Sequence, residues 1–409
     1  MTGVFTIKKI LLVSLPILSL LFGLYLEEDL STGGSKNDFI FHTLPTVIDF
    51  SNFSFITLNK HTAHFPLHYL LLTIPQLIFE DILAIKLVYF IFSLLFPFLV
   101  YINICKLYPD QKFNALIISL SLLYLPFYRA SSFWPNAHLT ALIFLLAANY
   151  CYILSLNSKN FIYKFLLIFF LSLSTYSMQT YALFFIFYLI YYFKNESLNI
   201  FIGIFFICVI FSLPGFYILL SVPVGENMGL NFTTNFSYTL ITNFSIILFF
   251  LLFFLFNKDS FIEIKNSFLD TSKYKILFFL FVFLILMINY ESNFPFGGGF
   301  FYKLSNLLFN NNFLFFLTGF LGLVLSWLFY KIDKNIFYII VLTNFMAVGY
   351  ITSQKYFEPI FLVLILVLCK NFLSKNIIDS KLNSLVFYSI NLSYFILASI
   401  NNSLDLLRF

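Results

Sequence analysis

Residues 26–69 read LEEDLSTGGSKNDFIFHTLPTVIDFSNFSFITLNKHTAHFPLHY and follow directly on the first apolar segment of the chain. Only 10% of the whole chain is charged, yet this stretch gathers many of its titratable groups: Glu27, Glu28, Asp29, Lys36, Asp38, Asp49, Lys60, His42, His61, His64 and His68. A charged side chain costs about 2.5–3.5 kcal/mol at the centre of a bilayer. The stretch therefore predicts a loop outside the hydrocarbon, between membrane-embedded segments, and it is where we expect a functional site.

The composition is that of a membrane protein. Hydrophobic residues make up 61% of the 409 residues, mean hydropathy is +0.93, and there are 62 Phe and 26 Tyr. Soluble domains are about 45–50% apolar, and helices satisfy their own backbone inside lipid. We therefore predict an all-α polytopic bundle in contact with the lipid bilayer. The net charge of +5 comes mostly from lysines in short linkers, which indicates orientation in a membrane and no nucleic-acid partner.

A bilayer core requires about 20 apolar residues per helix. On that criterion the sequence predicts about 11–14 transmembrane helices in one integral-membrane domain over residues 1–409. The expected spans lie near residues 8–26, 84–105, 113–128, 137–156, 161–177, 180–193, 198–221, 237–256, 275–290, 312–330, 336–352, 357–370 and 384–401.

The segment 66–79 is short and contains Pro75, so we interpret it as an interfacial or re-entrant helix. With that choice most lysine-bearing linkers fall on the side of the N-terminus, which the positive-inside rule makes cytoplasmic. Residues 27–83 then form the first external loop. The amino-acid usage, together with the absence of eukaryotic processing signals, favours a bacterial inner membrane.

Asp38 lies in GGSKNDFIFH, just before an apolar stripe with helical spacing: Phe39, Phe41, Leu44, Val47 and Ile48. This pattern predicts a short amphipathic helix on the membrane surface, with Asp38 in its N-terminal turn. A carboxylate at the lipid–water boundary can serve as a general base for an acceptor hydroxyl. The alternative is that Asp38 only caps the helix.

Glu28 and Asp29, next to Glu27, compete with Asp38 for that role. Repulsion among adjacent carboxylates makes one of them a better proton acceptor. The same three acids would also form an ordinary anionic flank at the end of a membrane helix.

Histidines and cations in the external loops are candidate substrate ligands. His61, His64 and His68 have spacings of three and four residues, which would suit a metal site on a continuous helix. Pro66 interrupts the run and no HExxH pattern occurs, so we expect no metal or other cofactor. Imidazoles suit a phosphate better, with Lys60 beside them. His42 fits either that role or packing.

Two later segments carry further cations. Arg129 lies in LPFYRASSFWPNAHL, and its planar guanidinium suits a phosphate. Lys355 and Tyr356 lie in SQKYFEP, at the expected external end of a span, where they would anchor the helix or hold a lipid phosphate.

The order of these motifs resembles the GT-C superfamily of polyprenyl-phosphate-sugar-dependent glycosyltransferases, which includes the protein O-mannosyltransferases and the aminoarabinose transferase that modifies lipid A. The resemblance rests on NDFIFH in the first loop, on HTAHFPLHYLL and EDILAIKLVYF after it, and on the position of FWPNAHL. It covers about the first 160 residues.

The resemblance implies transfer of a sugar from a polyprenyl-phosphate donor to a glycan, lipid or protein acceptor on the external face. Asp38 would deprotonate the acceptor, and Arg129, Lys355 and His64 would neutralise the departing phosphate. The chain has no DxD motif and no acid between Arg129 and His138, which disfavours a metal-assisted reaction.

Two other classes of membrane protein remain alternatives. A polysaccharide or O-antigen polymerase would be expected to have its largest external loop in the second half of the chain, with paired arginines. A transporter or flippase would be expected to carry ionisable residues within its spans and repeated halves. Neither pattern is evident here.

Overall fold

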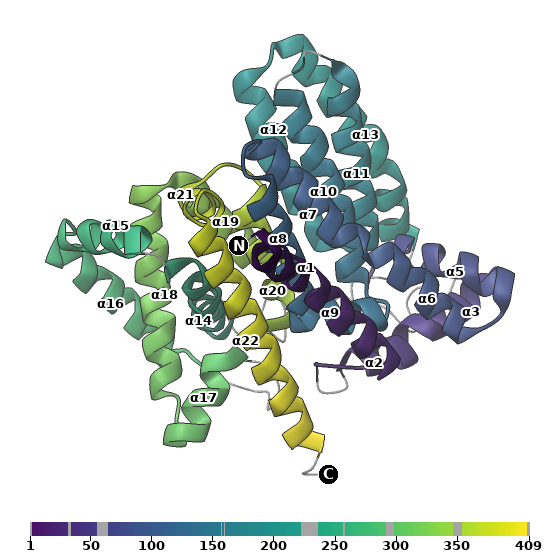
Figure 1. Cartoon of the computed structure of the whole chain (residues 1–409). Helices are drawn as coiled ribbons and strands as arrows, with labels where there is room; N and C mark the ends of the chain where they lie inside the picture. Colours follow the sequence, from purple (N-terminus) through teal and green to yellow (C-terminus); the bar gives the residue numbers. More distant parts are fainter. Residues whose placement is uncertain are drawn as a thin grey trace. The chain divides into compact units, whose positions relative to one another are not determined.

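The computed structural model of the chain is built of helices (Figure 1) and has no strand among the residues that it describes. Those residues are 2–31, 34–54, 64–156, 158, 160–221, 236–256, 258–291, 298–346 and 354–406. The chain forms two compact units. The first comprises residues 1–228 and 391–409, and the second comprises residues 229–390.

The first unit is organised around α10 (Ala137–Leu156), a largely buried helix. It packs against α5, α6, α7, α9 and α11, and Figure 1 shows α7, α10, α11, α12 and α13 side by side. The other helices of this unit are α1 (Thr2–Tyr25), α2 (Gly34–Asp38), α3 (Leu44–Ser51), α5 (Leu67–Phe79), α6 (Ile82–Ser93), α7 (Leu95–Leu107), α8 (Lys112–Ser121), α9 (Pro126–Phe133), α11 (Phe161–Ser177), α12 (Leu183–Asn195) and α13 (Leu198–Ser221). Short 3-10 turns follow α8 (Leu122–Tyr124) and α11 (Gln179–Ala182).

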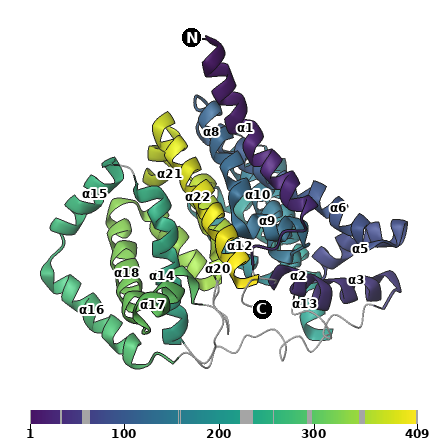
Figure 2. The same ribbon diagram turned by 60° about the horizontal axis from the view of Figure 1, so that its bottom comes forward.

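The second unit has α14 (Phe236–Leu255) at its centre, packed most extensively on α18 (Phe313–Ile332). Around them lie α15 (Lys258–Leu269), α16 (Lys273–Ile288), α17 (Gly299–Phe309), α19 (Lys334–Met346), α20 (Gln354–Val367) and α21 (Phe372–Ile378). α15 and α16 meet at 96°, a bend visible in Figure 2. The last helix, α22 (Lys381–Leu406), has its first ten residues in this unit and the rest in the first.

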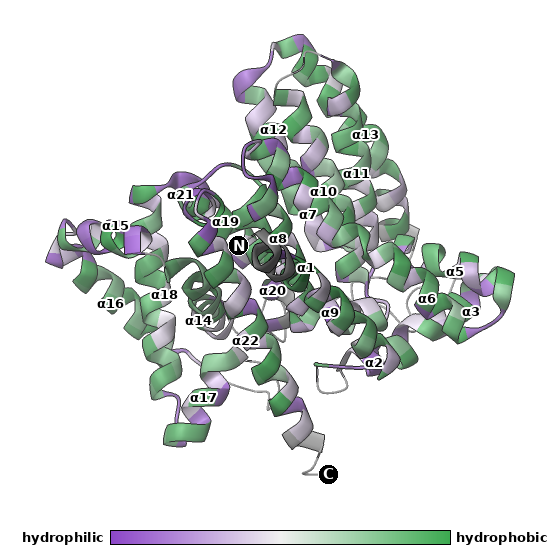
Figure 3. Ribbon diagram, viewed as in Figure 1, coloured by the Kyte–Doolittle hydropathy of each residue, from purple (hydrophilic) through white to green (hydrophobic). Residues whose placement is uncertain are grey.

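Apolar residues line most of the long helices, whereas hydrophilic ones gather at helix ends and connecting turns (Figure 3). Six helices of the described chain are long and apolar enough to cross a membrane, or nine if each of three bent pairs is one span. The six are Ile82–Leu107, Ala137–Leu156, Leu198–Ile218, Phe236–Leu255, Phe313–Ile332 and Lys381–Ser403. These helices are compatible with a multi-pass integral membrane protein.

The described chain has fewer long apolar helices than the 11–14 predicted spans, because one predicted span is bent and others form shorter helices. The run 113–128 bends by 68° before Pro126, whose ring cannot continue the preceding helix. α11 has 17 residues and α12 has 13, fewer than the roughly 20 that a perpendicular crossing needs. The segment 66–79 forms the 13-residue α5 and is likewise not among the long apolar helices.

The expected helix after Gly34 is present but begins earlier and is less regular than predicted. α2 passes into a π-helical turn (Phe39–Thr43) and then into α3. Asp38 is thus at the junction between α2 and the π turn rather than in the first helical turn. The buried stripe is Phe39, Thr43, Val47 and Phe50, while Phe41 and Ile48 are exposed.

Buried polar contacts connect the long helices of the first unit. The Asn149 amide donates to Asn103 Oδ1 at 3.0 Å, and Tyr188 Oη donates to Asn149 Oδ1 at 3.1 Å. This joins α7, α10 and α12 through side chains that would otherwise be unsatisfied in an apolar interior. A second link is the ion pair between buried Lys164 and Glu196, at 2.9 Å.

A side chain enters the backbone ladder of α13 near Pro214. The Tyr176 hydroxyl, from α11, donates to the Phe211 carbonyl and accepts from the Gly215 N–H, the latter at 3.0 Å. These are the two groups that would normally bond to each other within a helix. The inserted hydroxyl replaces one backbone hydrogen bond and so opens the helix locally. Because Gly215 has no Cβ, the Tyr176 ring can lie close to the helix.

Candidate functional site

The turn at the end of α1 directs two adjacent acids to different partners. The Glu27 N–H bonds to the Leu24 carbonyl and the Glu28 N–H to the Gly23 carbonyl, and Glu27 has φ 49°. These are the features of a Schellman motif, in which the chain reverses over a left-handed residue. The reversal brings the Glu28 side chain back beside Gly23 and leaves Glu27 facing another helix.

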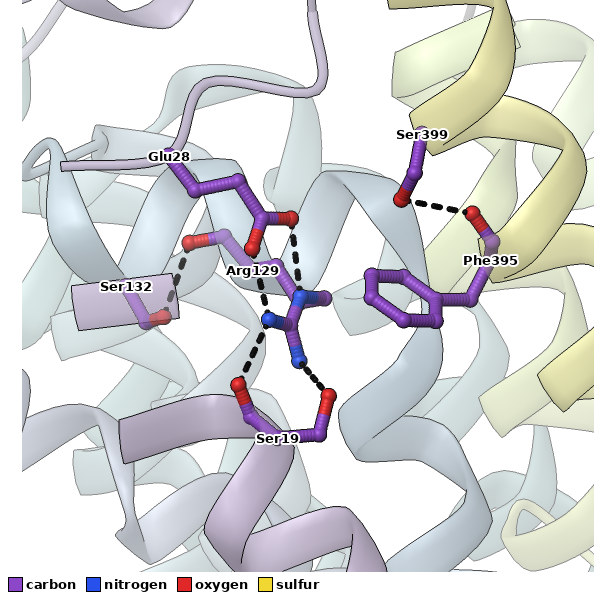
Figure 4. Close-up of polar contacts among 6 residues, drawn as sticks. All are labelled: Ser19, Glu28, Arg129, Ser132, Phe395 and Ser399. Carbon is purple, nitrogen blue, oxygen red and sulfur yellow. Dashed lines mark hydrogen bonds and ion pairs between the residues drawn. The ribbon is translucent and has the colours of Figure 1, made fainter. Parts of the chain in front are cut away.

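Glu28 is paired with Arg129 of α9 (Figure 4). Arg129 Nε and Nη2 donate to the two Glu28 carboxylate oxygens at 3.0 and 2.6 Å. Nη1 donates to Ser19 Oγ at 3.1 Å, and Nη2 also donates to the Ser19 carbonyl at 2.9 Å. Since a guanidinium has five N–H groups, these contacts occupy four of them.

The same ion pair is enclosed by apolar and small residues. Arg129 is 1% exposed, and its guanidinium carbon lies 4.4 Å from the centre of the Phe395 ring. A Cβ added to Gly23 would collide with Arg129 Nη2 and Glu28 Oε2. Glycine at this position of α1 is therefore what allows the pair to form against the helix.

Glu27 contacts the second buried cation, Lys86 of α6. Lys86 Nζ donates to Glu27 Oε1 at 2.7 Å and lies 3.8 Å from the centre of the Trp134 ring. Lys36 approaches the same ring at 5.2 Å, and Phe39 packs on it at 6.0 Å. The hydrogen bond from Lys86, together with its charge, lowers the pKa of Glu27 below its ordinary value of 4.5.

Asp29 caps the start of α2. Its Oδ1 accepts from the Ser31 N–H at 2.9 Å and from the Ser31 hydroxyl, and its Oδ2 accepts from the Lys36 N–H at 2.8 Å. Such bonds satisfy backbone donors that a helix start leaves open. Both oxygens of the Asp29 carboxylate thus accept hydrogen bonds that hold the loop in place.

Asp38 and His42 both belong to the helical run 34–51. Asp38 is half-buried at the entry of the π turn, directly before Phe39, which contacts Trp134. Its side chain makes no hydrogen bond to the start of that turn. His42 is exposed, one helical turn further on.

His68 belongs to a buried hydrogen-bond network at the start of α10. His68 Nδ1 lies 2.8 Å from Thr140 Oγ1, which is 3.1 Å from the Tyr89 hydroxyl. Tyr89 donates to the Asn136 carbonyl at 2.8 Å. Burial, with a smaller contribution from the charge of His64, lowers the pKa of His68 to about 3. The imidazole is therefore neutral at physiological pH.

His64 lies next to His138. Their ring centres are 6.3 Å apart, and the His138 ring also packs edge-on against Phe127 and Tyr181. No group of three or more His, Cys, Asp or Glu side chains in the described chain has the geometry of a metal site.

The other four candidates cannot be placed relative to this arrangement, because they lie wholly or in their side chains outside the described residues. Lys60 and His61 lie within residues 55–63, outside the described residues. Lys355 and Tyr356 are in the first turn of α20, in the second unit, and their side chains also lie outside the described part.

Sequence reasoning did not single out Lys86, Tyr89 and Thr140, whereas Trp134 could be interpreted from the sequence as a ring that stacks on a sugar or as part of the interfacial aromatic belt. One signal was present for Lys86, which interrupts the apolar run ILAIKLVYF. An ionisable residue inside such a run is a functional candidate by default. Tyr89 lies three residues later and therefore on the same face of α6. Nothing in the sequence distinguished Thr140 from other helical threonines.

The candidate site is therefore a polar cluster of the first unit, in which residues 27–38 and 64–68 meet α6 and the turn between α9 and α10. Comparison of the chain with protein-family models, with curated proteins and with solved structures finds no match.

Proposed function

We propose that this protein is an integral-membrane glycosyltransferase that moves a sugar from a polyprenyl-phosphate donor to a glycan, lipid or protein acceptor on the external face. The observation that carries the proposal is the concentration of buried polar chemistry beneath the first-loop helices of an otherwise apolar chain. Two paired cations lie where the loop meets α6 and α9, and three histidines lie at the start of α5 and α10. Asp38 directly precedes Phe39, which packs on Trp134. The order of motifs along the first 160 residues supports the same class.

Asp38 is our choice for the general base that deprotonates the acceptor hydroxyl. Glu28 has both oxygens on Arg129, and Asp29 has both on backbone or hydroxyl donors of the loop. These contacts give both carboxylates a structural task in the loop. Asp38 lies at a π turn, an irregularity that often accompanies functional sites, and its side chain is half-buried, so part of it faces outward.

Arg129 has a different role in this proposal from the one suggested by its sequence. With four N–H groups on Glu28 and Ser19, it positions the loop instead of binding a phosphate. His64, in the same cluster as His138, is the described residue that we assign to the departing phosphate.

The test is transfer of radiolabelled sugar from polyprenyl-phosphate donors in membranes, with Asp38→Asn compared with wild type. Loss of a general base lowers the rate about 10²–10⁴-fold. Asp49→Asn is the matched control, because Asp49 is another half-buried acid in the same helical run, and it should retain transfer.

Each result separates the parts of the proposal. Transfer that survives Asp38→Asn but is lost in Asp29→Asn would keep the class of enzyme and reject Asp38 as the base. Absence of transfer by the wild-type protein from every lipid-phosphate sugar, with donor quality verified, would reject the enzyme class.

A further inference from the structure

Several buried polar atoms have no hydrogen-bond partner among the described residues, and two of them belong to side chains that contact Tyr89 or Lys86 of α6. These two are Nε2 of His68 and Nε1 of Trp134, in side chains that are 0% and 4% exposed. A buried polar group without a partner costs about 1–3 kcal/mol. Native chains keep few such groups, so each invites an explanation, and a bound ligand that completes the hydrogen bond is one.

The His68 ring has one nitrogen committed and one available in either tautomer. If Thr140 donates to Nδ1, then Nε2 carries the proton and is a donor. If Nδ1 donates to Thr140, whose own hydroxyl can reach the Asn136 carbonyl at 3.4 Å, then Nε2 is an acceptor. The network thus fixes the ring through Nδ1 and leaves Nε2 for a further group.

The two atoms belong to one contiguous patch. Lys86 and Tyr89 lie on the same face of α6, about 5–6 Å apart between their Cβ atoms. Lys86 covers the Trp134 ring, and Tyr89 contacts both Asn136 and the His68 ring, the latter at 5.6 Å between ring centres.

The chemistry of the patch suits an uncharged ligand. Lys86 is already paired with Glu27, so the two charges balance. His68 is neutral, since burial lowers its pKa to about 3. An uncharged indole N–H and an uncharged imidazole offer hydrogen bonds without net charge, and sugar hydroxyls both donate and accept.

We propose that the patch formed by His68, Tyr89, Trp134 and Thr140 binds a sugar, with His68 Nε2 and Trp134 Nε1 hydrogen-bonded to its hydroxyl or ring oxygens. The proposal rests on the glycosyltransferase function and assigns the substrate group that this cluster recognises. The sugar is that of the donor or that of a glycan acceptor, which share this chemistry.

Two substitutions of His68 separate ligand binding from a structural role. Asn has its polar group near the place of Nδ1 and retains the contact with Thr140, whereas Gln has its polar group near the place of Nε2. Ligand binding through Nε2 predicts that His68→Asn raises KM for the sugar-bearing substrate about tenfold, while His68→Gln stays within about threefold of wild type. A purely structural role predicts the reverse order, which would overturn the proposal. A rise in KM for the donor or for the acceptor identifies which sugar is bound.

Direct binding can be measured without any transfer reaction, because the chain has two tryptophans. In Trp327→Phe, reconstituted in phospholipid nanodiscs without glycoside detergent, Trp134 alone reports on its surroundings. Methyl glycosides of mannose, glucose, galactose and arabinose are the probes. A saturable change in Trp134 emission that His68→Asn removes supports the site.

The binding result is independent of the transfer assay. No saturable change with any of the four glycosides would overturn the sugar site even if Asp38→Asn abolishes transfer. Glycoside binding in a protein that transfers no sugar would reject the enzyme and retain the site.

Discussion

Arg129 and Glu28, 101 residues apart in the chain, form a two-point ion pair that is buried against α1. The pair fastens the first loop to α9, and α9 leads directly into the turn that carries Trp134 and Asn136. The loop acids and the buried polar network are therefore positioned by the same contact. Removal of the Arg129–Glu28 ion pair should therefore lower the stability of the fold, and any effect on the transfer reaction should follow from that loss.

Glu28→Gln should lower the free energy of unfolding by about 3–5 kcal/mol, because it leaves the buried Arg129 cation uncompensated. The measurement is reversible unfolding in SDS mixed micelles. In a double-mutant cycle, Glu28→Gln combined with Arg129→Met should cost less than the sum of the single changes by about 0.5–3 kcal/mol. Strict additivity would mean that the two residues do not interact.

Gly23→Ala should also destabilise the protein, by about 1–3 kcal/mol, since the new methyl group overlaps the Arg129–Glu28 pair. Gly203→Ala is the matched control, because a Cβ there meets only the Phe161 ring at ordinary contact distance, 3.8 Å. Thermal unfolding in nanodiscs compares the two. Equal midpoints for both variants would show that the space beside Gly23 is not needed.

The pairing of Glu27 with Lys86 predicts a specific acid dependence. The pKa of Glu27 is lowered in the folded chain, so the pair stabilises the fold above the ordinary value of 4.5, and this stabilisation is lost as pH falls through the lower folded value. Glu27→Gln should reduce the melting temperature at neutral pH, and the difference from wild type should shrink below about pH 4.5. Glu80→Gln, which removes an exposed acid at the end of α5, should follow wild type. A constant difference across the pH range would contradict the assignment.

Tyr176→Phe removes the hydroxyl that satisfies both the Phe211 carbonyl and the Gly215 N–H. The expected loss of stability is about 1–3 kcal/mol, the cost of buried groups left without partners. Tyr217→Phe on the same helix is the control, because Tyr217 is 72% exposed. Unfolding midpoints that match in the two variants would indicate that the ladder recloses without the hydroxyl.

The sequence predicted the helical class and the helix after Gly34 because both depend on local composition and periodicity. It placed α11 at residues 161–177, as observed, but hydropathy did not register the bend before Pro126. The pairing of Glu28 with Arg129 was out of reach, since it depends on a turn at Glu27 and on the space beside Gly23. Asp38 remains the predicted base, and its role is still a prediction.

The insertion of Tyr176 into α13 has a consequence for how this chain can vary in evolution. A proline at 214 is tolerated where the backbone hydrogen bonds of α13 are already interrupted. The Tyr176 hydroxyl is useful only at such an interruption, and a side chain at 215 would press on the Tyr176 ring. The three positions constrain one another. In related sequences we expect them to change together, with phenylalanine at 176 wherever 214 is no longer proline.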